Sequence, residues 1–248
     1  MIDTHCHIDE EDEYDEILKD DFNNGVLIKI VSFCDVVNYD FALFLASKYN
    51  GIYLTLGFHP EYADFINYEN LLYLENTIVN NKKIIGIGEI GLDYHYDNSN
   101  KNKQIELFKK QIELSIKLDL PIVVHSRDSV LDTINILSQY KNIRGVIHCF
   151  NDSLEDALKY IDMGFYLGIG GIITFKNSNL FNIIKNIGLS NVVLETDSPY
   201  LAPVPVRGKK NSSKNIIFIA SKIAEILDIS VDDVLDNTSK NAKRVFDL

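Results

Sequence analysis

Six histidines are the first candidates for chemistry, because imidazole is both a metal ligand and a proton carrier near neutral pH. His5 and His7 lie two residues apart in the stretch IDTHCHID near the start of the chain. On an extended strand, residues two apart point to the same side, so both rings are expected on one face and Cys6 on the other. The spacing predicts two neighbouring metal ligands, with Cys6 packed in the core.

Further candidate ligands follow apolar runs later in the chain. His125 and His148 each end such a run, Glu89 ends the run IIGIGE, and Asp197 follows VVLET. With the first histidine pair they make four imidazoles and two carboxylates, which is more than one divalent ion needs. Two cations about 3.5–4 Å apart, bridged by a carboxylate and a hydroxide, would use all six groups. The mixed nitrogen and oxygen donors suit Zn, Mn, Fe or Mg and do not select between them.

This donor set predicts hydrolysis by a metal-activated water. A water between two cations loses much of its proton affinity and becomes a hydroxide near neutral pH. The cations would also polarise the phosphoryl or carbonyl oxygen of the bond that is cleaved. A carboxylate beside the water can orient it and accept its proton, and we assign that task to Asp197.

Other residues at the ends of the apolar runs are candidate substrate contacts. Arg127 could hold a phosphate through two hydrogen bonds or form a salt bridge with the next residue. His59 could bond a substrate phosphate or orient a metal ligand. Arg207 is a candidate phosphate contact, with simple solvation as the alternative. Tyr94 and Phe150 could stack on a base or pack in the core.

These residues can meet only if the apolar runs form neighbouring strands. Eight short runs rich in β-branched residues alternate with longer amphipathic stretches. The runs lie near Ile2–Cys6, Val26–Phe33, Ile52–Phe58, Ile84–Glu89, Ile122–His125, Gly145–His148, Phe165–Gly170 and Val192–Glu195. Helices are expected at Asn102–Leu118, Asp128–Tyr140, Ser153–Met163, Asn179–Ile187, Asn215–Leu227 and Val231–Phe246. This alternation predicts a (β/α)8 TIM barrel, in which the carboxyl ends of the strands form the catalytic face. No glycine-rich phosphate-binding motif follows the first run, which disfavours a doubly wound nucleotide-binding sheet.

Length and composition agree with one barrel domain over residues 1–248. The chain is 46% hydrophobic and 24% charged, enough to build a large core. No apolar run approaches the roughly 18 residues that span a bilayer, and the first residues lack the pattern of a secretory signal. Cys6, Cys34 and Cys149 have unrelated spacings, which favours free thiols in the cytoplasm. Nothing in the sequence points to an obligate protein partner or to a membrane.

The net charge of −12 excludes a broad basic surface that clamps nucleic acid. Nine acids and one lysine lie between Asp9 and Asp21, where we expect a solvated helix face. A phosphodiester substrate remains compatible with this charge, because two divalent ions near Arg127 would attract it locally. The charge therefore predicts weak, metal-dependent engagement of a chain end rather than tight binding along a duplex.

The ordered motifs resemble those of the TatD family of metal-dependent deoxyribonucleases, among the amidohydrolase-like barrels. They are THCHID at 4–9, GFHP at 57–60, GEIGLDY at 88–94, HSRD at 125–128, HCF at 148–150, GGIITFKN at 170–177, ETDSPYLAP at 195–203 and RGK at 207–209. The aspartate of the seventh motif matches the family's base as well as a ligand. The resemblance implies first-metal ligands at His5, His7 and Asp197, a bridging carboxylate at Glu89, and second-metal ligands at His125 and His148.

The resemblance implies hydrolysis of DNA phosphodiester bonds, exonucleolytic or directed at a single-stranded or free end. An alternative keeps the metal site for another ester or amide, such as an aminoacyl ester on RNA. A third hypothesis is a metal-binding scaffold without catalysis. Two stretches depart from the family pattern: Asn211–Ser213 replaces an Asn-Glu-Pro-like stretch, and His95–Asp97 stands where an arginine is common. Both follow strand ends, so we expect them to affect the grip on substrate rather than the metals.

Overall fold

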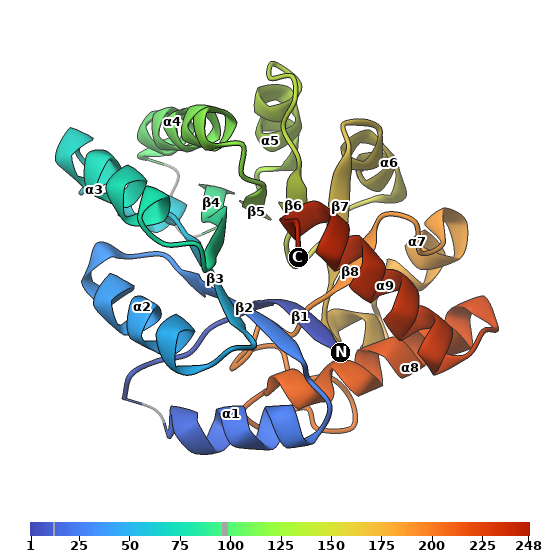
Figure 1. Ribbon diagram of the computed structural model, residues 1–248. Helices are drawn as coiled ribbons and strands as arrows, with labels where there is room; N and C mark the ends of the chain where they lie inside the picture. Colours follow the sequence, from blue (N-terminus) through green and yellow to red (C-terminus); the bar gives the residue numbers. More distant parts are fainter. Residues whose placement is uncertain (12, 96–98) are drawn as a thin grey trace.

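Eight parallel strands form one sheet in the computed structural model, which describes residues 1–11, 13–95 and 99–248 (Figure 1). Neighbouring strands pair in chain order from first to last. They are β1 (Ile2–Cys6), β2 (Ile28–Phe33), β3 (Ile52–Leu56), β4 (Ile84–Asp93), β5 (Ile122–Arg127), β6 (Gly145–Ile147), β7 (Phe165–Ile169) and β8 (Val192–Leu194). The last strand returns to the first, since Asp197 N donates to His5 O over 3.0 Å and His7 N to Ser198 O over 2.7 Å. The predicted (β/α)8 barrel is confirmed.

Helices surround the sheet and bury their apolar faces against it (Figure 1). In the helix over Lys101–Leu118, for example, Leu107, Phe108 and Ile112 recur at helical spacing and are buried. The helices are α1 (Tyr14–Asn23), α2 (Tyr39–Lys48), α3 (Tyr68–Val79), α4 (Lys101–Leu118), α5 (Val130–Leu137), α6 (Leu154–Asp162), α7 (Leu180–Ile187), α8 (Ile216–Leu227) and α9 (Val231–Phe246). None of these helices combines the length and hydropathy that crossing a membrane requires.

The amino-terminal end of the barrel is closed by α9, which crosses it in Figure 1. Its residues Val245 and Phe246 are buried against Ile2 and Val123 from the strands. The helix starts at a defined point, because the side chain of Ser230 accepts a hydrogen bond from Asp233 N at 3.0 Å. This end of the barrel is therefore a packed apolar core.

The strand pairing is irregular next to two candidate ligands, His5 in β1 and Glu89 in β4. The register between β1 and β2 shifts between Asp3 and Cys6, and that between β4 and β5 shifts between Gly88 and Ile90. A shift of this kind breaks the simple alternation of side chains. Strand β4 also continues to Asp93, four residues past the predicted end, so it brings a second carboxylate to the mouth of the barrel.

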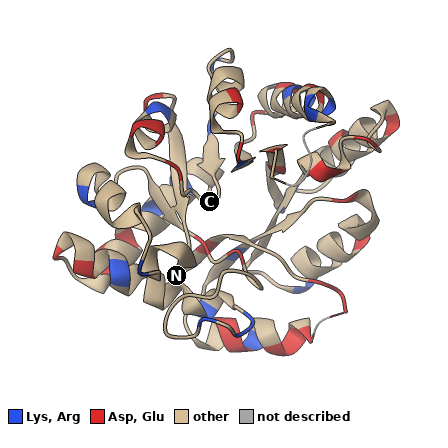
Figure 2. Ribbon diagram, turned by 180° about the vertical axis from the view of Figure 1, so that it is seen from behind, with Lys and Arg blue, Asp and Glu red and all other residues tan. Residues whose placement is uncertain are grey.

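The acidic segment after β1 is only partly a solvated face. Acidic residues lie along α1 in Figure 2, as expected. Asp21, however, is fully buried, and its carboxylate lies 2.6 Å from the buried ammonium of Lys29. It also accepts hydrogen bonds from the side chain of Ser212 and from Lys214 N. The expectation of solvation is wrong for this residue, because a buried lysine and the loop after β8 both need its charge.

Candidate metal centre and active site

His5 in β1 and His7, one residue past its end, have their Nε2 atoms 3.2 Å apart at the mouth of the barrel. His5 is 1% exposed, whereas the ring of His7 is partly open to solvent. Cys6 points away from them into the core, where its thiol lies 3.7 Å from Ile30 O. The two rings therefore share one side, as the spacing predicted.

Glu89 lies between two sets of imidazoles, with one carboxylate oxygen toward each. Its Oε1 is 2.7 Å from His125 Nδ1 and 3.0 Å from His148 Nε2. Its Oε2 is 3.5 Å from His5 Nε2 and 3.8 Å from His7 Nε2. A carboxylate placed in this way can serve two adjacent cations at once.

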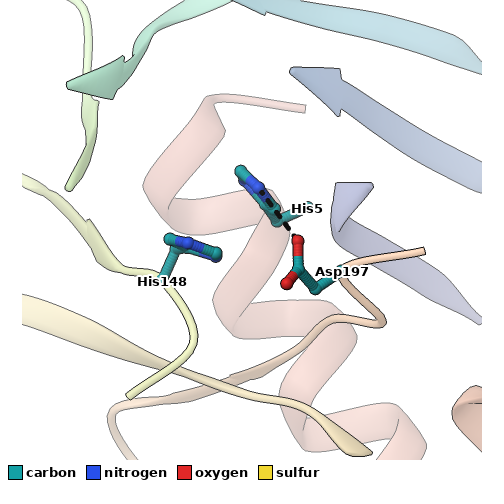
Figure 3. Close-up of side chains that lie close together, drawn as sticks. All are labelled: His5, His148 and Asp197. Carbon is teal, nitrogen blue, oxygen red and sulfur yellow. Dashed lines mark ion pairs between the residues drawn. The ribbon is translucent and has the colours of Figure 1, made fainter. Parts of the chain in front are cut away.

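Asp197 completes the first set from the loop that follows β8. Its Oδ1 lies 3.4 Å from His7 Nε2 and 3.7 Å from His5 Nε2. Figure 3 shows this carboxylate beside His5 and His148, three side chains from distant parts of the chain. The backbone of Asp197 has a φ of 53°, a left-handed conformation that aspartate tolerates better than most residues.

The donors fit divalent cations in number, type and spacing. Four compact groups of potential ligand atoms occur in the described ranges. Two of them meet at the carboxylate of Glu89: His5, His7 and Glu89, and Glu89, His125 and His148. The other two are His5, His148 and Asp197, and His59, Asp93 and His125. His5, Glu89 and His148 are buried, whereas the remaining side chains are partly exposed. Nδ1 of His5 is buried without a hydrogen-bond partner in the described ranges, so the ring is oriented by what its Nε2 faces. Converging imidazoles and carboxylates with this burial suit Zn, Mn, Fe or Mg.

The charges of this cluster are strongly coupled. Burial raises the pKa of Glu89, but the charge of His148 and hydrogen bonds from His125, His148 and His5 outweigh it and hold the pKa well below its usual range. Burial lowers the pKa of His148, yet Glu89 and the nearby Glu195 raise it well above the usual value. Without metal, protons on the imidazoles therefore balance the buried carboxylate.

Two carboxylates that sequence reasoning missed hold the imidazoles of the second set. Asp93 Oδ2 lies 3.0 Å from His125 Nε2, on the far side of the ring from Glu89. Glu195 is fully buried, with Oε1 3.4 Å from His148 Nδ1 and 2.5 Å from Cys149 N. The hydrogen bond between His125 and Asp93 can fix the orientation and tautomer of a ligating histidine, whereas Glu195 acts on His148 through its charge at ion-pair distance. The signal in the sequence was their position, in GLDY directly after Glu89 and in the ETD stretch.

Room for Glu195 depends on a glycine in the neighbouring strand. A Cβ atom at Gly168 in β7 would lie 2.1 Å from Glu195 Oε2, far inside van der Waals contact. Strand β7 supplies no member of the two ligand groups, yet its glycine allows the carboxylate to lie behind His148. A glycine at this position is therefore needed for Glu195 to occupy its place beside His148.

The predicted substrate contacts lie at different places. His59 joins the cluster, with its ring 4.5 Å from that of His125 and its Nε2 3.8 Å from Glu89 Oε1. Burial lowers the pKa of His59 to about 4, so this ring is neutral at pH 7. Arg127 lines the cavity above the metal centre. The guanidinium of Arg207 lies 4.2 Å from the ring centroid of Phe175, a contact outside the imidazole cluster.

Two hollows meet above the metal centre and share Arg127 among their walls. The larger, of about 640 Å³, is lined on one side by Asp9, Glu61 and Asp64. The other, of about 540 Å³, extends toward Asp152, whose pKa burial raises to about 6. Both volumes are in the range of small-molecule sites, and in each the lining carboxylates outnumber the lysines and arginines.

The departures from the family pattern have structural roles. Asn211 is buried, and its side-chain amide donates to Thr196 O at 2.9 Å and Tyr200 O at 2.7 Å. Ser212 bonds Asp21, so this stretch supports the loop after β8 rather than facing the cavity. His95 lies 2.7 Å from Asp128 at the rim. Tyr96 and Asp97 lie outside the described residues.

Comparisons with known proteins agree with this geometry. The family model described as TatD related DNase matches residues 2–247. The chain is 35% identical to the uncharacterized metal-dependent hydrolase YabD of Bacillus subtilis, over 99% of this chain and 98% of that protein. It is 34% identical to the uncharacterized metal-dependent hydrolase YcfH of Escherichia coli K12, over 99% and 95%. A crystal structure of the TatD homologue YJJV of Escherichia coli superimposes with a TM-score of 0.94 at 27% identity, covering 100% of this chain and 98% of that one. The chain therefore belongs to the TatD-related family and is a metal-dependent hydrolase.

Proposed function

We propose that this hydrolase is a deoxyribonuclease that cleaves phosphodiester bonds at a free or single-stranded end of DNA, using two divalent cations. The observation that carries the proposal is the position of Glu89, whose two oxygens face two different imidazole sets. Two adjacent cations suit an in-line displacement at phosphorus, because both the attacking and the leaving oxygen carry negative charge. The family's description as a DNase supports DNA as the substrate.

The residues divide the work as follows. His5, His7 and Asp197 would hold the first cation, His125 and His148 would hold the second, and Glu89 would contribute one oxygen to each. When bound, the cations supply an acidified water and polarise a phosphoryl oxygen. Asp197, at the edge of the cluster, orients that water and takes up its proton.

Four further residues position these groups and the substrate. Asp93 and Glu195 keep the rings of His125 and His148 in their ligating orientation. Nδ1 of His59 accepts from Glu61 N over 3.3 Å, so its proton is on Nε2, directed toward the metal centre and able to bond a phosphate oxygen. Arg127 at the wall of the cavity holds the phosphate by charge-assisted hydrogen bonds.

A test uses protein stripped of metal and reloaded with Mg²⁺, Mn²⁺ or Zn²⁺. We expect metal-dependent release of nucleotides from a single-stranded oligodeoxynucleotide and slower cleavage of a blunt duplex. The control is the metal-free protein, which should be inactive and regain activity on reloading. Failure of every metal form to cleave DNA would refute the deoxyribonuclease.

A second candidate activity is hydrolysis of an aminoacyl ester on RNA. The carboxylates of Asp9 and Glu61, which line the cavity, favour it, since they would attract an α-ammonium group and repel additional phosphates. The same metal-loaded samples should be tested on aminoacyl esters. Turnover of esters without cleavage of DNA would establish this activity in place of the first.

A further inference from the structure

Tyr200 is an exposed aromatic residue beside the metal centre. Its side chain is 61% exposed, and it borders both hollows above the centre, as Arg127 does. Its ring lies 6.2 Å from that of His7, one of the first-metal ligands, in an edge-on arrangement. An exposed aromatic ring beside a phosphate site offers a flat face on which a base can stack.

The backbone of Tyr200 is held firmly although its side chain is open. Its amide donates to Asp197 O at 2.8 Å, so ligand and aromatic belong to one tight turn. Its carbonyl accepts from the amide of buried Asn211 at 2.7 Å, and Asn211 is held in turn by Asn215. Because this backbone is already ordered, binding of a ligand to the ring costs little additional backbone entropy.

The aromatic residues singled out in the sequence have other contacts. Phe150 is 2% exposed and packs against Tyr160, with ring centroids 6.3 Å apart. Tyr94 donates its hydroxyl to Asp132 at 3.0 Å, and the ammonium of Lys101 lies 4.9 Å from its ring. Of the two alternatives for Phe150, stacking on a base or packing in the core, its burial supports packing.

We propose that Tyr200 stacks on the base of the nucleotide whose phosphate lies at the metal centre. This contact rests on the proposed deoxyribonuclease function, and it assigns most of the binding affinity to the base of the substrate. Arg127 and the cations would hold one phosphate, whereas the carboxylates of Asp9 and Glu61 in the same cavity would repel the next ones. Affinity must then come from a neutral group, and a flat aromatic face binds any base without sequence preference.

Binding of small ligands isolates this contact. We would titrate metal-loaded protein with deoxyadenosine 5′-monophosphate and with 2-deoxyribose 5-phosphate, which lacks the base. The wild type should prefer the nucleotide about tenfold or more, in line with stacking on one aromatic ring. Tyr200→Ala should reduce that preference to about onefold, and Tyr200→Phe should keep it, because the ring rather than the hydroxyl makes the contact.

Controls separate recognition from folding. Tyr68→Ala removes an aromatic ring that is 77% exposed on α3, outside the mouth, and should leave the preference unchanged. Equal metal content and thermal midpoints would show that Tyr200→Ala is intact. In cleavage assays, Tyr200→Ala should raise KM for oligonucleotides with normal ends by about tenfold, with kcat changed less than about threefold, and should have no effect on ends that lack bases.

The outcomes are distinct. Retention of the nucleotide preference in Tyr200→Ala would overturn the stacking contact, and so would its loss in Tyr200→Phe. Failure of the wild type to cleave DNA, with a preference that still depends on Tyr200, would overturn the deoxyribonuclease alone.

Discussion

The same strands carry apolar side chains at one end of the barrel and ionisable side chains at the other. At the amino-terminal end, Ile2 and Val123 pack against Phe246 of α9 in a dry core. At the carboxyl end, His5 and His125 of the same two strands face buried carboxylates. Two or three residues along a strand thus separate a cluster stabilised by apolar burial from one stabilised by opposite charges. The comparison suggests that stability and chemistry can be altered independently.

The largest effect is expected at the catalytic end, for Asp197→Asn. Loss of the proposed base should lower kcat on the order of 10³-fold, because an amide cannot accept the proton of water. Steady-state cleavage of a single-stranded oligonucleotide, with metal content determined on the same samples, measures this. Asp236→Asn on the exposed face of α9 is the matched control. Near-normal kcat in a fully metal-loaded Asp197→Asn protein would remove its role as base.

At the opposite end, Phe246→Ala should lower the free energy of unfolding by about 3 kcal/mol or more, since it leaves a cavity in a packed core. Denaturant titration measures the loss. Per folded molecule, kcat/KM should stay within about twofold of the wild type. A large fall in kcat/KM with unchanged metal content would show that the two ends are coupled.

A smaller effect, on metal affinity, is expected at Asp93, which contacts the candidate ligand His125. Asp93→Asn should weaken binding of the second cation by about 10- to 100-fold, because His125 loses the carboxylate that orients its ring. Calorimetric metal titration would detect it. Asp64→Asn, at the same wall but paired with Lys103, should leave metal affinity within about twofold. Equal affinities in both variants would contradict the orienting role of Asp93.

The smallest effect is a pH dependence confined to the catalytic end. The raised pKa of His148 means that its proton stabilises the metal-free fold below the unfolded pKa, and that this contribution is lost as pH rises through the folded pKa. A cation must displace that proton, so metal affinity should rise with pH over the same range. Calorimetry in buffers of different ionisation enthalpy should show about one proton released. The absence of proton release at pH 7 would contradict the protonated state of His148.

The sequence predicted the strands of the barrel and most of the candidate ligands, but from different patterns. Runs of β-branched residues predicted the eight strands, and the two-residue spacing placed His5 and His7 together. Asp93 was missed because β4 extends beyond its apolar run and changes register beside Glu89, so that alternation cannot be extrapolated along it. The pairing of Asp21 with Lys29 was missed because it joins elements whose packing no local pattern encodes.

Gly168 shows how a residue without a functional group can govern chemistry. The volume left by its missing side chain is occupied by an oxygen of Glu195, and that carboxylate faces His148. An added methyl group would push Glu195 toward the imidazole and alter the ring's basicity without touching any ligand. Searches for inactive natural variants should therefore include positions that carry no reactive atoms, since Gly168 leaves the room that the Glu195 carboxylate occupies beside His148.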